Sequence, residues 1–207
     1  MQERLDRMRE CFGEASLVVK KKADLSRLKA AVSECLDETP GKNGNIQGGA
    51  GFRQVVIEYW NLVKWVRGIS HVQVFPSIRV KEKPGEGPYE TTKLHSDVFA
   101  GDPSGVVVMI PLFGDIEFGG VEFYRPTKNF DKFTFYSDYA LAPDFAPEYL
   151  GKMEEGHIHF VDAWCLHKTM VGKRRVSLDH RMIFDRFIDG DTKGTRMRNY
   201  IHIDQFP

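Results

Sequence analysis

The spacing of apolar residues changes near residue 70, and this change constrains the fold more than any other feature of the sequence. In residues 71–81 every second residue is apolar, apart from an interruption at Phe75 and Pro76. Successive side chains of a strand point to opposite faces, so this alternation predicts a strand with one buried face. Residues 106–112 are apolar without a break and predict a strand with both faces buried. Further strands are expected at residues 119–124, 156–161, 164–171 and 174–184.

The sequence before residue 70 has the period of helices instead. Apolar residues recur every three or four positions in residues 24–38 and 52–67, which predicts two amphipathic helices. Asp24 is a candidate cap for the first helix, and a glycine-rich segment, residues 39–51, connects the two. Helices followed by many short strands favour a β barrel or sandwich buttressed by helices. We expect a single domain of 207 residues.

Composition excludes several classes of protein. Acidic and basic residues balance to a formal net charge of zero, which disfavours a general nucleic-acid binder. No apolar stretch approaches the roughly 20 residues of a membrane span, and the N-terminus lacks the apolar core of a signal peptide. The three cysteines, Cys11, Cys35 and Cys165, are too widely spaced for a disulfide framework or a CxxC metal site. A cytoplasmic protein without a membrane partner is expected.

His95-Ser96-Asp97 is the first part of a candidate metal site. On a strand, residues i and i+2 share a face and lie about 6.6 Å apart, so His95 and Asp97 can bind one ion. His167, on a later expected strand, is well placed to supply a third ligand. Two imidazoles and one carboxylate leave coordination positions open, an arrangement typical of non-haem Fe(II) oxygenases.

Arg175-Val176-Ser177 follows eight residues after His167. With this motif the chain resembles the Fe(II)/2-oxoglutarate-dependent dioxygenase superfamily over residues 70–187. The glycine turns before Phe123 and Phe160 are also similar to that family. The resemblance implies a mainly β fold with flanking helices. Its double-stranded β-helix, or jelly-roll, core would span residues 70–187, with a helical part over residues 1–68 and a C-terminal extension over residues 188–207.

The resemblance also implies roles for individual residues. His95, Asp97 and His167 would hold Fe(II) and form the catalytic centre. Arg175 and Ser177 would grip the distal carboxylate of 2-oxoglutarate, with Arg181, on the same strand face, as an alternative or second gripper. A guanidinium suits this task because its planar fork meets a carboxylate with two hydrogen bonds. The reaction would consume O2 and release succinate and CO2. Because related halogenases replace the carboxylate ligand, Asp97 favours hydroxylation or desaturation.

The substrate is less constrained than the metal site. We expect a small polar molecule, with Arg79, Lys93 and Trp164 as candidate binding residues and the loop of residues 83–88 as a candidate lid. Cationic groups around the mouth of a barrel would suit an anionic or polar compound.

Several alternatives remain open from the sequence. Within the superfamily, the enzyme could hydroxylate a side chain of a protein or peptide. The Arg175-x5-Arg181 spacing is also similar to nucleic-acid demethylases. Outside the enzymes, the chain could be a binding or sensor jelly roll without turnover. A cupin-like metal site at His157 and His159 is a further alternative that lacks a convincing acidic partner. Oligomeric state cannot be inferred from the sequence.

Overall fold

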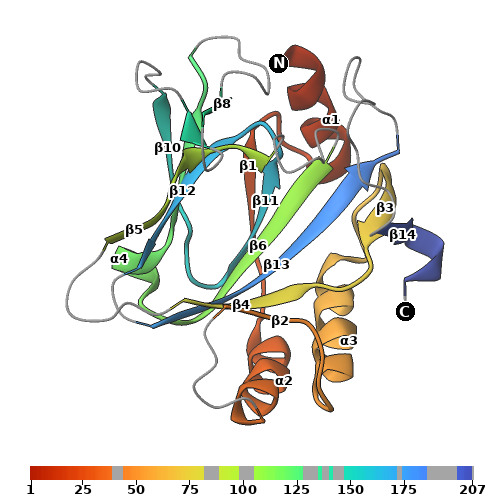
Figure 1. Cartoon of the computed structure of the whole chain (residues 1–207). Helices are drawn as coiled ribbons and strands as arrows, with labels where there is room; N and C mark the ends of the chain where they lie inside the picture. Colours follow the sequence, from red (N-terminus) through yellow and green to blue (C-terminus); the bar gives the residue numbers. More distant parts are fainter. Residues whose placement is uncertain are drawn as a thin grey trace.

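The protein folds into two facing antiparallel sheets with helices on the outer side of the larger sheet (Figure 1). The computed structural model describes residues 1–38, 44–81, 89–97, 105–127, 135–136, 140–141, 147–171, 174–185 and 200–206.

The larger sheet has the strand order β1-β11-β6-β13-β3-β14, with β4 also paired to β13 and β2 paired to β4. Its strands are β1 (Val18–Lys22), β2 (Gly44–Ile46), β3 (Ile69–Gln73), β4 (Ser77–Lys81), β6 (Gly105–Gly114), β11 (His157–Asp162), β13 (Arg175–Phe184) and β14 (Tyr200–His202).

The smaller sheet has the order β10-β7-β12-β5, so β5 is an edge strand. Its strands are β5 (Tyr89–His95), β7 (Val121–Arg125), β10 (Glu148–Lys152) and β12 (Leu166–Val171). Two short strands, β8 (Phe135–Tyr136) and β9 (Ala140–Leu141), pair separately.

Three helices cover the outer face of the larger sheet. They are α1 (Gln2–Phe12), α2 (Ser26–Asp37) and α3 (Phe52–Val63), while α4 (Ile116–Gly119) and the 3-10 helix η5 (Ile203–Gln205) are single turns. In Figure 1, α2 and α3 lie side by side. Phe12 of α1 stacks on Phe160 of β11 with a centroid distance of 4.4 Å. The helices and this face therefore form the main hydrophobic core.

The inner face of the larger sheet meets the smaller sheet in a second apolar cluster. It contains Val107 and Met109 of β6, Val161 of β11 and Phe123 of β7. Because Val108 and Ile110 face the helices instead, both faces of β6 are buried, as its unbroken apolar run predicts. The two sheets thus enclose a space whose inner wall includes alternate residues of β13 and β4.

Several expected elements have different bounds in the structure. The alternating segment 71–81 is two strands, β3 and β4, separated at Phe75 and Pro76. The second expected helix ends at Val63, although Val66 still packs into the core. The helix α1 and the strand β1 were not anticipated, because α1 is strongly polar and β1 contains the Lys20–Lys22 run. The N-terminal part is therefore not purely helical, since β1 and β2 join the larger sheet.

The lysines of β1 lie at the surface, where Lys20 and Lys21 are partly exposed and Lys22 is exposed. Lys20 pairs with Glu154, and Lys21 lies 2.7 Å from the carboxylate of Glu14. The backbone of β1 meanwhile pairs with β11. An edge strand rich in lysine is a common protection against pairing with another chain.

The expected lid, residues 83–88, and residues 39–43 of the glycine-rich segment lie outside the described residues. The three cysteines are buried and unbridged. Within the described part of the chain, no helix is long and apolar enough to cross a membrane.

Candidate active site

The side chains of His95, Asp97 and His167 converge at one end of the smaller sheet. His95 at the end of β5 is paired in register with His167 on β12, and Asp97 follows two residues later. The imidazole centroids of His95 and His167 are 4.3 Å apart, and Nε2 of His95 lies 4.0 Å from Oδ1 of Asp97. One potential ligand atom of each residue lies within 4.8 Å of the others. These atoms are close enough to coordinate a single ion.

The surroundings of His167 favour the neutral form of its ring, which is the form that binds metals. Burial, followed by the neighbouring His95, lowers the pKa of His167 to about 4, so the imidazole is neutral at neutral pH. Its Nδ1 lies 3.2 Å from the carbonyl oxygen of Cys165. In a neutral ring this nitrogen donates to the carbonyl, which leaves the lone pair of Nε2 for a metal.

Asp97 is a buried carboxylate beside a cation. Burial alone would raise the pKa of Asp97. Nearby positive charges, with Arg181 the strongest, outweigh burial and hold the pKa well below its usual range. Nη2 of Arg181 lies 3.4 Å from Oδ2 of Asp97. A small pocket beside this pair is lined mainly by apolar side chains of β6 and β13, including Val107 and Met182. The structure thus places Arg181 at the metal-ligand carboxylate.

Arg175 lies at the other end of the same face of β13. Its side chain is among the largest that are fully buried, with 2% of the residue exposed. Neither Nε nor Nη1 has a hydrogen-bond partner among the described residues. Burial lowers the pKa of this guanidinium, and the nearby Asp179 only partly offsets that effect. A buried cation with unsatisfied donors is costly, so this position is suited to receive an anion.

Ser177, Asp179 and Arg79 form a connected group between Arg175 and Arg181. The hydroxyl of Ser177 donates to Oδ1 of Asp179 over 3.3 Å. Nε of Arg79, on the neighbouring strand β4, lies 2.8 Å from Oδ2 of Asp179. Ser177 therefore lies next to Arg175, as the Arg-x-Ser motif requires, while its hydroxyl is engaged by Asp179.

Trp164, another substrate candidate, packs against the N-terminal helix. The Trp164 ring packs under the guanidinium of Arg4 at 4.8 Å, and its backbone N–H donates to Asp162. The contact with Arg4 links α1 to the turn between β11 and β12, and the hydrogen bond to Asp162 lies within that turn. Lys93 belongs to β5, but its side chain lies outside the described residues.

His157, His159 and Cys165 occupy other positions. His159 is fully buried, and its Nε2 accepts a hydrogen bond from the backbone of Glu154. His157 is partly exposed near Glu155. Burial raises the pKa of the Cys165 thiol well above its ordinary value, which fits a small core side chain. Among the described residues, the triad is the one group of three potential ligands that converges.

Two residues near the site were not singled out from the sequence. Lys81 lies directly opposite Arg175 across the β4–β13 pair, and burial followed by the charges of Arg79 and Arg175 lowers its pKa. Asp179 orients Arg79. The alternation along β4 places Arg79 and Lys81 on one face, and this signal could have identified Lys81 once the pairing partner of β4 was known.

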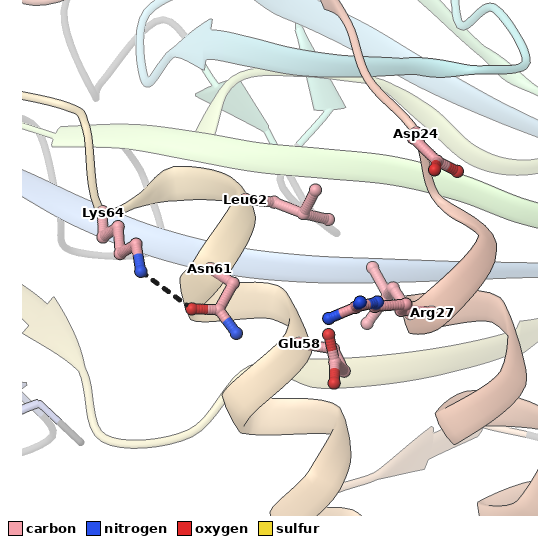
Figure 2. Close-up of a pocket in the computed structure, with 7 residues that line it drawn as sticks. Asp24, Arg27, Glu58, Asn61, Leu62 and Lys64 are labelled. Carbon is pink, nitrogen blue, oxygen red and sulfur yellow. Dashed lines mark hydrogen bonds between the residues drawn. The ribbon is translucent and has the colours of Figure 1, made fainter.

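A separate hollow lies between α2 and α3 on the helical side of the molecule (Figure 2). In Figure 2 the side chains of Arg27 and Glu58 point toward each other across it, and Nζ of Lys64 donates to Oδ1 of Asn61 over 3.0 Å. These are ordinary polar surface contacts, and the hollow does not adjoin the triad.

Comparisons with known proteins identify the fold. No protein-family model matches the sequence, and no curated protein matches it. The solved structure of SnoN, a non-heme alpha ketoglutarate dependent epimerase from nogalamycin biosynthesis, matches 88% of this chain and 80% of its own at 14% identity and a TM-score of 0.57. SnoK, a carbocyclase of the same biosynthesis, matches 89% and 84% at 15% identity and a TM-score of 0.52.

HygX from Streptomyces hygroscopicus, solved with nickel and 2-oxoglutarate bound, matches 100% of this chain and 99% of its own at 11% identity and a TM-score of 0.51. At identities this low the agreement is one of fold. The mainly β architecture with N-terminal helices, predicted as a double-stranded β-helix, is therefore confirmed.

Proposed function

We propose that this protein is an Fe(II)- and 2-oxoglutarate-dependent oxygenase. The observation that carries the proposal is the convergence of His95, Asp97 and His167 within 4.8 Å. A second observation is the buried, unsatisfied Arg175, which lies on the same face of β13 as Arg181, the residue that contacts Asp97. The first feature suits a ferrous ion, and the second suits the free carboxylate of a keto-diacid. The fold, shared with SnoN and HygX, supports the combination.

The donor set fits iron rather than a closed structural site. Two imidazoles and one ionised carboxylate supply three ligands, whereas structural zinc sites are completed by four protein ligands. Bound iron would supply O2 activation coupled to oxidative decarboxylation of 2-oxoglutarate to succinate and CO2. Arg181 would hold Oδ2 of Asp97, which keeps the carboxylate ionised and oriented.

The rest of the inner wall would bind the co-substrate. Arg175 has an unsatisfied donor, Nε or Nη1, on each of the two edges of its guanidinium that can meet a carboxylate, and Lys81 adds a second cation across the strand pair. The burial of Arg175 excludes water from that contact, and hydrogen bonds to a charged group are stronger where water is excluded. Placement of Arg181 beside Asp97 favours Arg175 as the gripper.

We further propose hydroxylation of a small polar molecule as the reaction. The intact carboxylate ligand Asp97 supports hydroxylation over halogenation. The solved epimerase and carbocyclase of this fold show that other outcomes are compatible with it, and product analysis decides among them.

The first experiment is an anaerobic titration with Fe(II) and 2-oxoglutarate, followed by a succinate-release assay against a metabolite panel. We expect a visible charge-transfer band that needs both components and iron-dependent succinate release. Alkylated oligonucleotides and peptides in the same panel test the demethylase and peptide-hydroxylase alternatives. Absence of both the band and the succinate would leave a binding protein instead.

Substitutions make the assay specific to the triad. His95→Ala and Asp97→Ala should each abolish iron-dependent succinate formation while the circular dichroism spectrum stays unchanged. His157→Ala, a histidine of β11 outside the triad, is the matched control and should retain turnover. Full turnover in either triad variant would contradict the ligand assignment.

A further inference from the structure

The inner wall of the described barrel carries more positive charge than iron and 2-oxoglutarate require. Its cationic side chains lie on β4 and β13 and face two carboxylates, Asp97 and Asp179. These cations are Arg79, Lys81, Arg175 and Arg181. A ferrous ion and a 2-oxoglutarate dianion cancel each other. Counted over these described residues, two positive charges therefore remain in the filled site, and their field would attract an anion.

Arg79 is the most accessible of the three arginines on this wall. Its side chain is 37% exposed, compared with 21% for Arg181, and Arg175 is almost fully enclosed. Arg181 is also engaged by Asp97. Of the three arginines, Arg79 is thus the one that a molecule entering the barrel can contact most directly.

The guanidinium of Arg79 is paired on one side. Its Nε lies 2.8 Å from Oδ2 of Asp179, whose other oxygen accepts a hydrogen bond from the Ser177 hydroxyl. Nε makes no hydrogen bond to a described residue, so the contact with Asp179 is an ion pair, and Asp179 is the one ion-pair partner of Arg79 among those residues. Contact through Nε leaves the outer nitrogens of the planar fork to a carboxylate.

Arg79 also lies between the two expected subsites. On the strand pair it is opposite Ser177, two residues from the position of Arg175. Its partner Asp179 is two residues from Arg181 on the same face of β13, and Arg181 contacts the metal-ligand candidate Asp97. An anion bound by Arg79 would therefore lie between the Arg175 end and the metal end of the site.

We propose that Arg79, oriented by Asp179, binds an acidic group of the substrate, so that the enzyme acts on a carboxylate-bearing small molecule. The inference rests on the proposed oxygenase function. Carboxylates could reach Arg79 from two sources, the substrate or the iron-chelating end of 2-oxoglutarate, and the experiment separates them.

The test is calorimetric titration at constant ionic strength with N-acetylglycine and with its neutral amide. The protein is first loaded with Co(II) and saturated with 2-oxoglutarate, and the titration is repeated on the metal-free protein. We expect the wild type to bind the acid and not the amide. Arg79→Gln should bind the acid at least tenfold more weakly, because a hydrogen bond to a charged group is lost, while its affinity for 2-oxoglutarate stays unchanged.

Two further variants guard against a folding defect. Arg79→Lys keeps a cation beside Asp179 and should show an intermediate affinity for the acid. Arg53→Gln, on the exposed face of α3, is the matched control and should bind as the wild type does.

Equal binding of acid and amide, or equal binding of the acid by wild type and Arg79→Gln, would overturn the proposal. So would weaker 2-oxoglutarate binding in Arg79→Gln without any change for the acid, since Arg79 would then serve the co-substrate. If Co(II) and 2-oxoglutarate fail to bind the wild type, the oxygenase function fails, and the metal-free titration still tests the anion site.

Discussion

Replacing Arg175 with methionine should make the empty protein more stable and at the same time remove its affinity for 2-oxoglutarate. Arg175 is buried without partners for Nε and Nη1, and burial lowers the pKa of its guanidinium more than Asp179 raises it. The buried positive charge therefore lowers the stability of the protein as long as no anion is bound to it. Methionine keeps much of the volume and removes the charge.

The size of both effects follows from this burial. Replacing poorly compensated buried charge by an apolar side chain of similar volume stabilises proteins by about 1–4 kcal/mol. For a chain of this length each kcal/mol raises Tm by about 2–4 °C. The loss of two charge-assisted hydrogen bonds at about 1.5–3 kcal/mol each should weaken 2-oxoglutarate binding by at least about a hundredfold.

The assay combines thermal unfolding of the metal-free protein with 2-oxoglutarate titration of the Co(II)-loaded protein. Arg181→Met is the matched control, and it should have the opposite effect on stability because it leaves Asp97 buried without its cation. A metal-free Arg175→Met that melts below the wild type, or one that binds 2-oxoglutarate normally, would refute the reasoning.

Three other outcomes are expected. Arg181→Met should also weaken Co(II) binding by about tenfold to a hundredfold, the usual effect of losing a group that orients a ligand, and unchanged visible spectra in a Co(II) titration would contradict this. Arg4→Met should cost about 3–5 kcal/mol in urea denaturation, because it leaves the buried Asp162 carboxylate unpaired; a loss below 1 kcal/mol would argue against it. Burial lowers the pKa of His180 to about 4 from 6.5, so the unfolded state binds more protons between these values and stability falls by about 3 kcal/mol as pH drops through that window. His180→Gln should flatten this part of the stability profile, and an unchanged slope would show that other groups cause it.

The triad could be predicted from the sequence because its signal is local. His95 and Asp97 are two residues apart on an expected strand, and His167 follows in an expected strand whose neighbour was unknown. The alternation in residues 71–81 depends on one buried face, and β4 has one, since Ile78 and Val80 are buried while Arg79 and Lys81 are partly exposed. Both faces of β6 are buried, so its sequence is an unbroken apolar run, and this run predicted the strand.

The contacts between strands could not be predicted in the same way. Arg181 and Arg175 share a face of β13, so the sequence alone could not show which of them binds 2-oxoglutarate. The contact between Arg181 and Asp97 depends on the fold. The same holds for Arg79, whose partner Asp179 lies one hundred positions later and on another strand. The N-terminal helix α1 was missed because its apolar stripe is narrow, with Met8 and Phe12 among few buried residues.

The pairing of His95 with His167 has a consequence for the integrity of the smaller sheet. β5 is an edge strand of that sheet. Edge strands have unpaired backbone groups and can pair with the strands of other chains. An ion bound by both His95 on β5 and His167 on β12 would cross-link this edge strand to the next strand of the sheet. Amide protons of β5 should then exchange faster after a chelator removes the iron. Loss of iron would therefore favour aggregation through β5 in addition to abolishing activity.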